Sequence, residues 1–209
     1  MTKKEKILII AEEEFAKHGF DAVSMNDLVK KLDMNKATIY YHYKDKKNLY
    51  HTVIKTAMAK SNANIKEIFN KTKDNETLLR DYVNATIFTI KENPNIVPLA
   101  LRELANFGAD IDESFIPFIE VEINSLQKVL DGFDLKEEYK NMNTFAFFSF
   151  IHGTINSFYA IQMSALPLGN DKQLKQNSEK TLDFIAEFIS NIILNAIVKN
   201  KEEKWNIKT

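Results

Sequence analysis

A stretch of fewer than thirty residues, beginning at Ser24, constrains the fold of this chain most. Ser24 can cap a helix by accepting a hydrogen bond from the amide of Asp27, and Asp27 can answer it as a capping box. The apolar residues that follow have helical spacing, and the run ends at Asp33, about two turns on. Asn35 can then cap a second short helix that extends to His42. The pattern predicts two short helices joined by a tight turn.

The second of these helices has one obvious inward residue, Ile39. Its other face offers a positive charge, hydroxyl groups and an imidazole, from Lys36, Thr38, Tyr41 and His42. Such a surface suits a DNA groove, which is lined by phosphates and base edges. The stretch therefore indicates a DNA-binding helix-turn-helix.

At these residues the chain resembles the TetR family of bacterial transcriptional regulators. The family combines a first helix containing F-x-x-x-G, a Ser- or Thr-capped second helix and a Lys- and Tyr-bearing recognition helix. The matching residues here are Ile7, Ile10, Ala11, Phe15, Gly19 and Phe20, followed by 24–32, 35–43 and 45–49. Two departures are Leu32-Asp33 in the turn, where Asp tolerates a left-handed backbone less well than Gly, and Ala37 in place of a glycine, which stiffens the recognition helix.

We predict that DNA is bound mainly by the second short helix, with Lys36 as the principal donor to base edges. Tyr40, His42 and Lys46 are expected to anchor phosphates, as is the first-turn amide region of the preceding helix. The predicted DNA-binding residues are Ser24, Met25, Asn35, Lys36, Thr38, Tyr40, Tyr41, His42 and Lys46. Alternatives remain open: Tyr40 and Tyr43 can be core residues, the core being favoured for Tyr43, and His42 can be a surface imidazole without a contact.

The net charge of −1 is unevenly distributed along the chain. Residues 1–60 hold 12 lysines and 8 acidic residues, whereas the remainder carries a net negative charge. The positive surplus coincides with the predicted helix-turn-helix, so only that part gains from releasing counterions on a polyanion. A solvated lysine-rich face is the alternative interpretation of this surplus.

Helical spacing dominates the whole chain, and sustained alternation is missing, which predicts an all-α fold of about nine helices. The expected helices lie at about 3–18, 24–33, 36–42, 46–70, 96–107, 112–130, 136–165 and 174–199, and a further one between the polar patch 71–76 and residues 93–95 contains Leu79 and Ile90. Asp134 and Glu137 resemble a capping box, and residues 166–169 resemble the turn before the last helix. We predict a three-helix DNA-binding domain in residues 1–46 and a larger helical ligand-binding and dimerisation domain in residues 47–209.

The last two predicted helices are apolar almost all round. A helix with two apolar faces needs two partners, so one face is expected to meet the monomer's core and the other a second subunit. One recognition helix reads only a few base pairs, which favours two copies about 34 to 36 Å apart on a near-palindromic operator. The TetR resemblance implies the same homodimer. The predicted interface residues are Gly153, Ser157, Phe184, Phe188 and Ile192.

The TetR resemblance also implies a small-molecule inducer that binds the downstream domain and changes the spacing of the two recognition helices. The 15 Phe and 7 Tyr of the chain permit an apolar cavity for it. The predicted ligand-binding residues are Asn106, Phe148, His152, Asn156, Tyr159 and Gln162. Ordinary core packing is the alternative for each of them.

An acidic run at residues 12–14, with His18, has a spacing that can bind a metal ion. Nothing completes such a site, because the sequence lacks HExxH, cysteine, a Gly-rich phosphate loop and GxSxG. We therefore interpret the run as a solvated face and expect no enzymatic activity, no metal and no cofactor.

Together these features predict a transcriptional regulator, a repressor by analogy with the family, that a small and largely apolar ligand releases from DNA. The alternative is an apolar small-molecule carrier or interaction module whose amino-terminal helices are only structural. No segment approaches eighteen uninterrupted apolar residues, and the charged start of the chain is unlike a signal peptide. The expected location is the cytoplasm, without a membrane partner.

Overall fold

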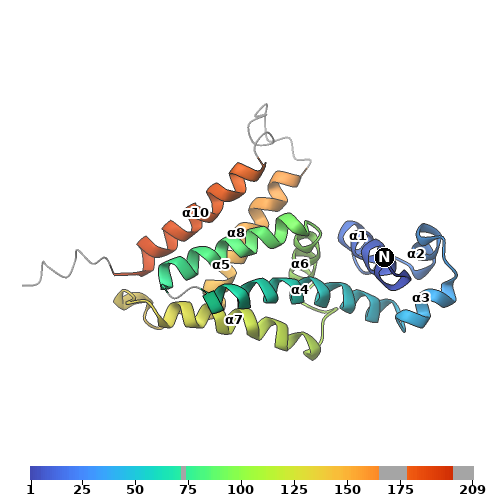
Figure 1. The fold of residues 1–209 in the computed structure, drawn as a ribbon, viewed down its shortest axis with the longest axis horizontal. Coiled ribbons are helices and arrows are strands. Elements are labelled where there is room, and N and C mark those ends of the chain that lie inside the picture. The colour runs from blue at the N-terminus through green and yellow to red at the C-terminus, as the bar shows by residue number, and fades with distance from the viewer. Residues whose placement is uncertain (72–73, 165–177, 200–209) are drawn as a thin grey trace, which may run out of the picture. The chain divides into compact units, whose positions relative to one another are not determined.

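The computed structural model describes residues 1–71, 74–164 and 178–199. Within these ranges the chain forms nine α-helices and two short 3-10 helices (Figure 1). The β pairing in the described residues is limited to an isolated bridge between Leu135 and Val198. The all-α prediction is therefore confirmed.

The described chain packs as two units. The first, unit 1, comprises residues 1–61 and 89–118, and unit 2 comprises residues 62–88 and the described residues from 119 onward. Packing thus groups the start of the fourth helix with the helices that precede it. The predicted functional boundary after residue 46 stays a prediction.

Unit 1 holds the helices that carry the helix-turn-helix pattern. Its elements are α1 (Lys3–His18), α2 (Met25–Leu32), α3 (Lys36–His42), the first part of α4 (Lys46–Lys71), α6 (Ile96–Ala105) and the 3-10 turn η1 (Glu113–Phe115). The first helix begins at a full capping box between Thr2 and Glu5 and ends at Gly19. Its boundaries and those of α3 coincide with the predicted ones.

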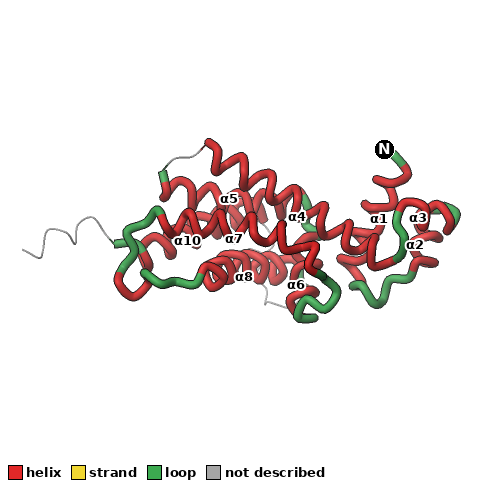
Figure 2. The backbone as a smooth tube through the Cα atoms, turned by 90° about the horizontal axis from the view of Figure 1, so that it is seen from below, coloured by secondary structure: helices red, strands yellow, loops and turns green. Residues whose placement is uncertain are grey.

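One apolar core holds α1, α2, α3 and the start of α4 together. Figure 2 shows the backbone of α1, α2 and α3 side by side. Each helix contributes residues at helical spacing to this core, and the fully buried ones include Ile7, Ala11, Phe15, Leu28, Ile39, Leu49 and Val53. A helix as short as α2 or α3 is marginal in isolation, so this shared burial is what stabilises the pair.

Unit 2 is built from longer helices. Its elements are the rest of α4, most of α5 (Asn75–Glu92), most of α7 (Ile116–Asp131), the 3-10 turn η2 (Glu137–Tyr139), α8 (Thr144–Met163) and α10 (Ser178–Ile197). The buried side chains include Leu79, Val83, Leu126, Val129, Phe147, Ile151, Ile155, Ile189 and Ile193. Among the described helices, none has the length and apolar character needed to cross a bilayer.

The predicted helix at 136–165 is wrong at its start. Asp134 and Glu137 do not open it; Glu137 begins the turn η2, and Asp134 instead accepts from the Lys199 backbone amide at 2.9 Å and from its ammonium at 3.1 Å. The long helix α8 begins later, where the Asn143 side chain accepts from the Phe145 amide. A contact distant in the sequence therefore overrides the local capping signal.

Two smaller differences concern other helix ends. The predicted helix at 112–130 is a 3-10 turn, capped by Asp112, followed by α7, and the predicted helix at 96–107 ends at Ala105. The predicted turn at 166–169, the predicted start of the last helix at 174 and the tail with Trp205 lie outside the described residues.

Candidate nucleic-acid interface

The first short helix, α2, is opened by Ser24. The Ser24 hydroxyl accepts from the Asp27 amide at 3.1 Å and donates to the Asp27 carboxylate at 2.5 Å. The Asp27 carboxylate thus accepts from the Ser24 hydroxyl, whereas in a capping box it would accept from the Ser24 backbone amide. This hydrogen bond lowers the pKa of Asp27 and keeps its charge in the first turn, where the helix dipole favours it.

The turn between α2 and α3 is made by Asp33, which has a left-handed backbone with φ 48° and ψ 48°. Asp is one of the few residues besides Gly that adopt this conformation at moderate cost. The Met34 amide then donates to the Val29 carbonyl at 3.4 Å, which closes the end of α2. The departure from glycine in this turn is therefore accommodated.

The recognition helix, α3, is fixed at both ends. The Asn35 side chain accepts from the Ala37 amide at 2.9 Å, and Ile39 is completely buried. Tyr43, the residue that follows α3, is also buried and donates its hydroxyl to the Lys4 carbonyl at 3.2 Å. The core interpretation of Tyr43 is confirmed, and burial raises the pKa of its phenol.

The outward face of α3 carries the main predicted contact residues. Lys36 is exposed, and its ammonium lies 5.7 Å from the centre of the Tyr40 ring. Tyr41 is 85% exposed and meets the His42 ring edge-on at 5.1 Å, while Thr38 is half-buried. An ammonium, a phenol and an imidazole are thus displayed on one short, rigidly seated helix.

The side chains of two predicted contact residues are engaged within the protein. The Met25 side chain is buried, so only its backbone amide can face DNA. The Lys46 ammonium donates to the Phe20 carbonyl at 2.8 Å and lies 4.2 Å from the Phe20 ring centre. Lys44 and Lys47, which flank Lys46 in this segment, are exposed but were not among the predicted contacts. The sequence signal for them is the group of three lysines in residues 44–47.

The acidic run of α1 is not the solvated face that we expected. Glu14 is only 7% exposed and pairs with Lys31 of α2, and Glu12 accepts from the Asn95 side chain at 3.1 Å. Two of its three carboxylates, those of Glu12 and Glu14, therefore help to hold unit 1 together, whereas Glu13 is exposed. Among the described residues, no group of three His, Cys, Asp or Glu side chains could hold a metal ion.

Helix α6 is hydrogen-bonded to the helix-turn-helix core, a connection that the sequence did not reveal. The Arg102 guanidinium donates to the carbonyls of Ala16 at 3.3 Å and Lys17 at 2.9 Å, at the carboxyl end of α1. The neighbouring Glu103 accepts from the hydroxyl of Tyr50, and burial and this carboxylate raise the pKa of that phenol. These bonds tie α6 to α1 and α4 within unit 1.

In unit 2, the predicted ligand residue His152 lies in a polar cluster among apolar side chains. Its Nε2 is 2.8 Å from the Tyr82 hydroxyl and 3.5 Å from the Glu122 carboxylate, and its ring stacks on Phe148 at 4.2 Å. Burial lowers the pKa of His152, which Glu122 opposes, and burial raises the pKa of Tyr82. Both shifts favour the uncharged form of the ring, and the two rings are each other's hydrogen-bond partners in this cluster.

The other predicted ligand residues are not all in one unit. Asn156, Tyr159 and Gln162 lie on α8, and burial raises the pKa of Tyr159. Within the described ranges, the Gln162 amide nitrogen is buried without a hydrogen-bond acceptor. Asn106 belongs to unit 1, where it follows α6 and donates to Asp110 at 2.9 Å.

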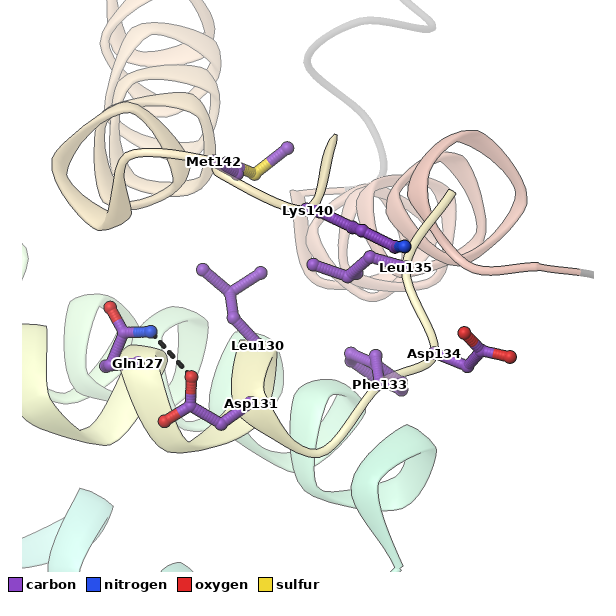
Figure 3. Close-up of a pocket in the computed structure, with 8 residues that line it drawn as sticks. All are labelled: Gln127, Leu130, Asp131, Phe133, Asp134, Leu135, Lys140 and Met142. Atoms are coloured by element: carbon purple, nitrogen blue, oxygen red, sulfur yellow. Dashed lines mark hydrogen bonds between the residues drawn. The ribbon is translucent and has the colours of Figure 1, made fainter. Parts of the chain in front are cut away.

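A pocket of about 240 Å³ opens at the carboxyl end of α7, where Leu130, Phe133 and Met142 supply apolar contacts (Figure 3). None of the predicted ligand residues lines it. Its polar groups are already paired: Gln127 donates to Asp131 at 2.7 Å, Asp134 pairs with Lys199, and Lys140 pairs with Glu137. The polar side chains that line the pocket are thus already engaged with other groups of the protein.

The predicted dimer residues on α10 are exposed apolar side chains. Phe184 and Phe188 on α10 are 60% and 48% exposed and stack on each other at 5.8 Å, and Ile192 continues the same helix. On α8, a Cβ added at Gly153 would meet no atom within 4 Å, and Ser157 is exposed. Side chains this large and apolar in water mark a surface that is typically covered by a partner.

The geometry of α2 and α3 defines the class of protein. Two short capped helices, joined by a tight turn and seated on α1 and α4, present a polar and basic second helix to solvent. This is the arrangement of a helix-turn-helix DNA-binding domain.

Comparison with known proteins shows which proteins this chain is similar to. Residues 7–53 match the family model for bacterial regulatory proteins of the tetR family. A solved TetR-family transcription regulator from Marinobacter aquaeolei VT8 has the same fold, with a TM-score of 0.70 and 18% identity, over 95% of this chain and 96% of that one. Residues 7–53 thus match the tetR family model, and the described chain shares its fold with this solved TetR-family regulator.

Two curated relatives are from Staphylococcus aureus. The transcriptional regulator QacR is 39% identical over 54 residues, which are 26% of this chain and 29% of QacR. IcaR, the negative transcriptional regulator of the biofilm operon icaADBC, is 30% identical over 89 residues, or 43% of this chain and 48% of IcaR. The chain thus matches less than half of the length of either relative. Both of these relatives are transcriptional regulators.

Proposed function

We propose that this protein is a transcriptional regulator, a repressor in the first instance, that binds operator DNA through α3. The observation that carries the proposal is the seating of α3: Ile39 and Tyr43 are buried on one side, while Lys36, Tyr40 and Tyr41 are exposed on the other. A helix held in this way can enter the major groove without losing its own fold. A regulator of chromosomal DNA acts in the bacterial cytoplasm, which is the proposed location.

The proposed DNA-binding form is a homodimer on a near-palindromic operator. The exposed side chains of Phe184, Phe188 and Ile192 support it, because a second copy of the same surface would remove them from water. Specificity supports it too, since one helix-turn-helix contacts few bases and two copies on a two-fold site double the number. The isologous pairing would bring α8 and α10 of each copy together as four helices.

The proposed signal is a small, largely apolar ligand that binds in unit 2 and releases the operator. The buried Gln162 amide nitrogen supports this, since a buried donor that has no acceptor among the described residues can be satisfied by an acceptor atom of a ligand. Half-buried aromatic side chains on α8, such as Phe148 and Tyr159, would contact its apolar part. The ligand would act by favouring the dimer state that binds DNA less well.

The test is the double variant Lys36→Ala with Tyr41→Ala. We expect it to lose specific binding to a duplex that the unchanged protein binds, while the dimer and the helical content persist, because both side chains are exposed and neither contributes to the core. Lys66→Ala, an exposed lysine of unit 2, is the matched control and should bind as the unchanged protein does.

Binding by electrophoretic mobility shift, with excess nonspecific competitor, gives the readout. Retained specific binding by the double variant would contradict the assignment of α3 as the reading helix. Failure of the unchanged protein to bind any duplex, including duplexes selected from random sequence, would favour the alternative function as an apolar-ligand carrier.

A further inference from the structure

The first two turns of α1 carry three lysines, Lys3, Lys4 and Lys6, which we call the α1 lysine cluster. All three are exposed, and in the parts of the chain that the structure describes none of them forms an ion pair. The acid between them, Glu5, accepts from the Thr2 amide at 2.8 Å as part of the capping box. The cluster therefore has a positive surplus that no neighbouring acid pairs.

Three other exposed lysines of the chain are held in ion pairs. Lys31 pairs with Glu14, Lys71 with Glu67 at 2.5 Å, and Lys140 with Glu137 at 2.7 Å. The lysines of the α1 cluster differ from these three, because among the described residues they form no ion pair.

The α1 lysine cluster is fixed beside the end of the recognition helix. The Tyr43 hydroxyl donates to the carbonyl of Lys4 at 3.2 Å, and Tyr43 is the residue that directly follows α3. Below this bond, Ile7 of α1 and Ile39 of α3 are fully buried in the same core, and Figure 2 shows the amino-terminal turn of α1 next to α3. A duplex that receives α3 in its groove therefore also approaches the lysine cluster.

The first turn of α1 is also held in shape before DNA arrives. The Thr2 hydroxyl accepts from the Glu5 amide at 3.2 Å, and the Glu5 carboxylate accepts from the Thr2 amide, so both hydrogen bonds of the capping box are formed. Lysines on a formed helical turn lose less freedom on binding than lysines on a flexible arm. They are compact point charges, and phosphate oxygens are the partners that suit them.

We propose that the α1 lysine cluster binds backbone phosphates of the duplex immediately outside the bases contacted by α3. The occupant is duplex DNA, because the cluster meets the end of the recognition helix and has the charge opposite to that of phosphate. Contacts of this kind add affinity and fix the position of the domain without reading sequence. The proposal rests on the proposed DNA-binding function and extends its contact surface.

The test compares the full-length variant Lys3→Gln with Lys4→Gln against the unchanged protein, on an operator duplex that the unchanged protein binds. The dissociation constant is measured over a salt series. The logarithm of the association constant falls linearly with the logarithm of the salt concentration, and each lost phosphate contact should make this slope shallower by ~0.9. The two substitutions should therefore make it shallower by ~1.8 per bound protomer, with no change in sequence preference. Lys3→Arg with Lys4→Arg keeps the charges and should keep the slope.

Two controls make the result specific. Lys66→Gln with Lys128→Gln removes the same charge from exposed positions of unit 2 and should leave the slope unchanged. Trimming the duplex to the bases contacted by α3 should abolish the difference between the Gln variant and the unchanged protein, because the flanking phosphates are gone.

An unchanged salt slope for Lys3→Gln with Lys4→Gln on the long duplex would overturn the inference while leaving the proposed function intact. An equal loss in the Lys66 and Lys128 variant would also overturn it, since the effect would then be one of net charge. If the unchanged protein bound no duplex specifically, the proposed function and this inference would fall together.

Discussion

The Arg102 side chain lies directly against Gly19, at a place where a Cβ atom on residue 19 would stand 3.1 Å from Arg102 Nη1. Gly19 has φ 83° and ψ 168°, a backbone region that is almost exclusive to glycine. The same guanidinium donates to the Lys17 carbonyl at 2.9 Å. Gly19 therefore ends α1 and also leaves room for the arginine that joins α6 to it.

Gly19→Ala should destabilise unit 1. We expect a loss of about 1–3 kcal/mol in the free energy of unfolding, because alanine must adopt a glycine conformation and its Cβ also crowds Arg102. Urea denaturation at fixed protein concentration measures this loss. The same change in an Arg102→Ala background should cost less, since the crowding is then gone while the backbone strain remains. A Gly19→Ala variant as stable as the unchanged protein would contradict this account.

Tyr43→Phe should cost about 1 kcal/mol, because it removes the buried hydroxyl that donates to Lys4 and leaves that carbonyl without this donor. Thermal unfolding followed by circular dichroism detects the change. Tyr41→Phe is the matched control, since Tyr41 is exposed and the same atom is lost to water without effect on stability. Equal melting temperatures for the two variants would show that the Tyr43 bond contributes nothing.

His152 should make the stability of the protein depend on pH. Burial lowers its pKa below the ordinary value of 6.5, so its contribution is fully present above about pH 6.5 and is lost as the pH falls through the folded-state pKa. We expect the unfolding free energy to decline below pH 6.5, and less steeply in His152→Gln. Denaturation curves at about pH 7.5, 6.5 and 5.5 test this. Parallel pH profiles for the two proteins would exclude the role of this imidazole.

Phe184→Asp with Phe188→Asp should convert the proposed dimer into a monomer, because charges at the centre of an apolar interface would be buried without partners. Analytical ultracentrifugation over a concentration series distinguishes the two states. Phe107→Asp is the control: Phe107 is 96% exposed and has a left-handed backbone that Asp tolerates, so this variant should associate as the unchanged protein does. A dimer that survives both α10 substitutions would place the interface elsewhere.

The sequence predicted the helix-turn-helix best, because its boundaries are set by local groups. Asn35 caps α3 through a residue two positions away, and Gly19 stops α1 through its own backbone. The inward role of Ile39 follows from spacing within a single short helix. Such signals lie within a few residues of the feature that they specify.

What could not be predicted depends on contacts between distant residues. The Lys46 ammonium donates to the carbonyl of Phe20, and Glu14 is buried against Lys31 of another helix. Asp134 accepts from Lys199, and α8 begins after the position that the capping signal indicated. Periodicity and caps say nothing of these pairings, because they arise only when helices pack.

The most direct measurement is footprinting of the purified protein on the DNA that flanks its own gene, over a salt series and with nonspecific competitor. The account predicts a protected near-palindrome whose two halves are separated by about one helical turn, with an affinity that falls steeply as salt rises. If neither this DNA nor duplexes selected from random sequence showed a protected site, the central claim that α3 reads an operator would be contradicted.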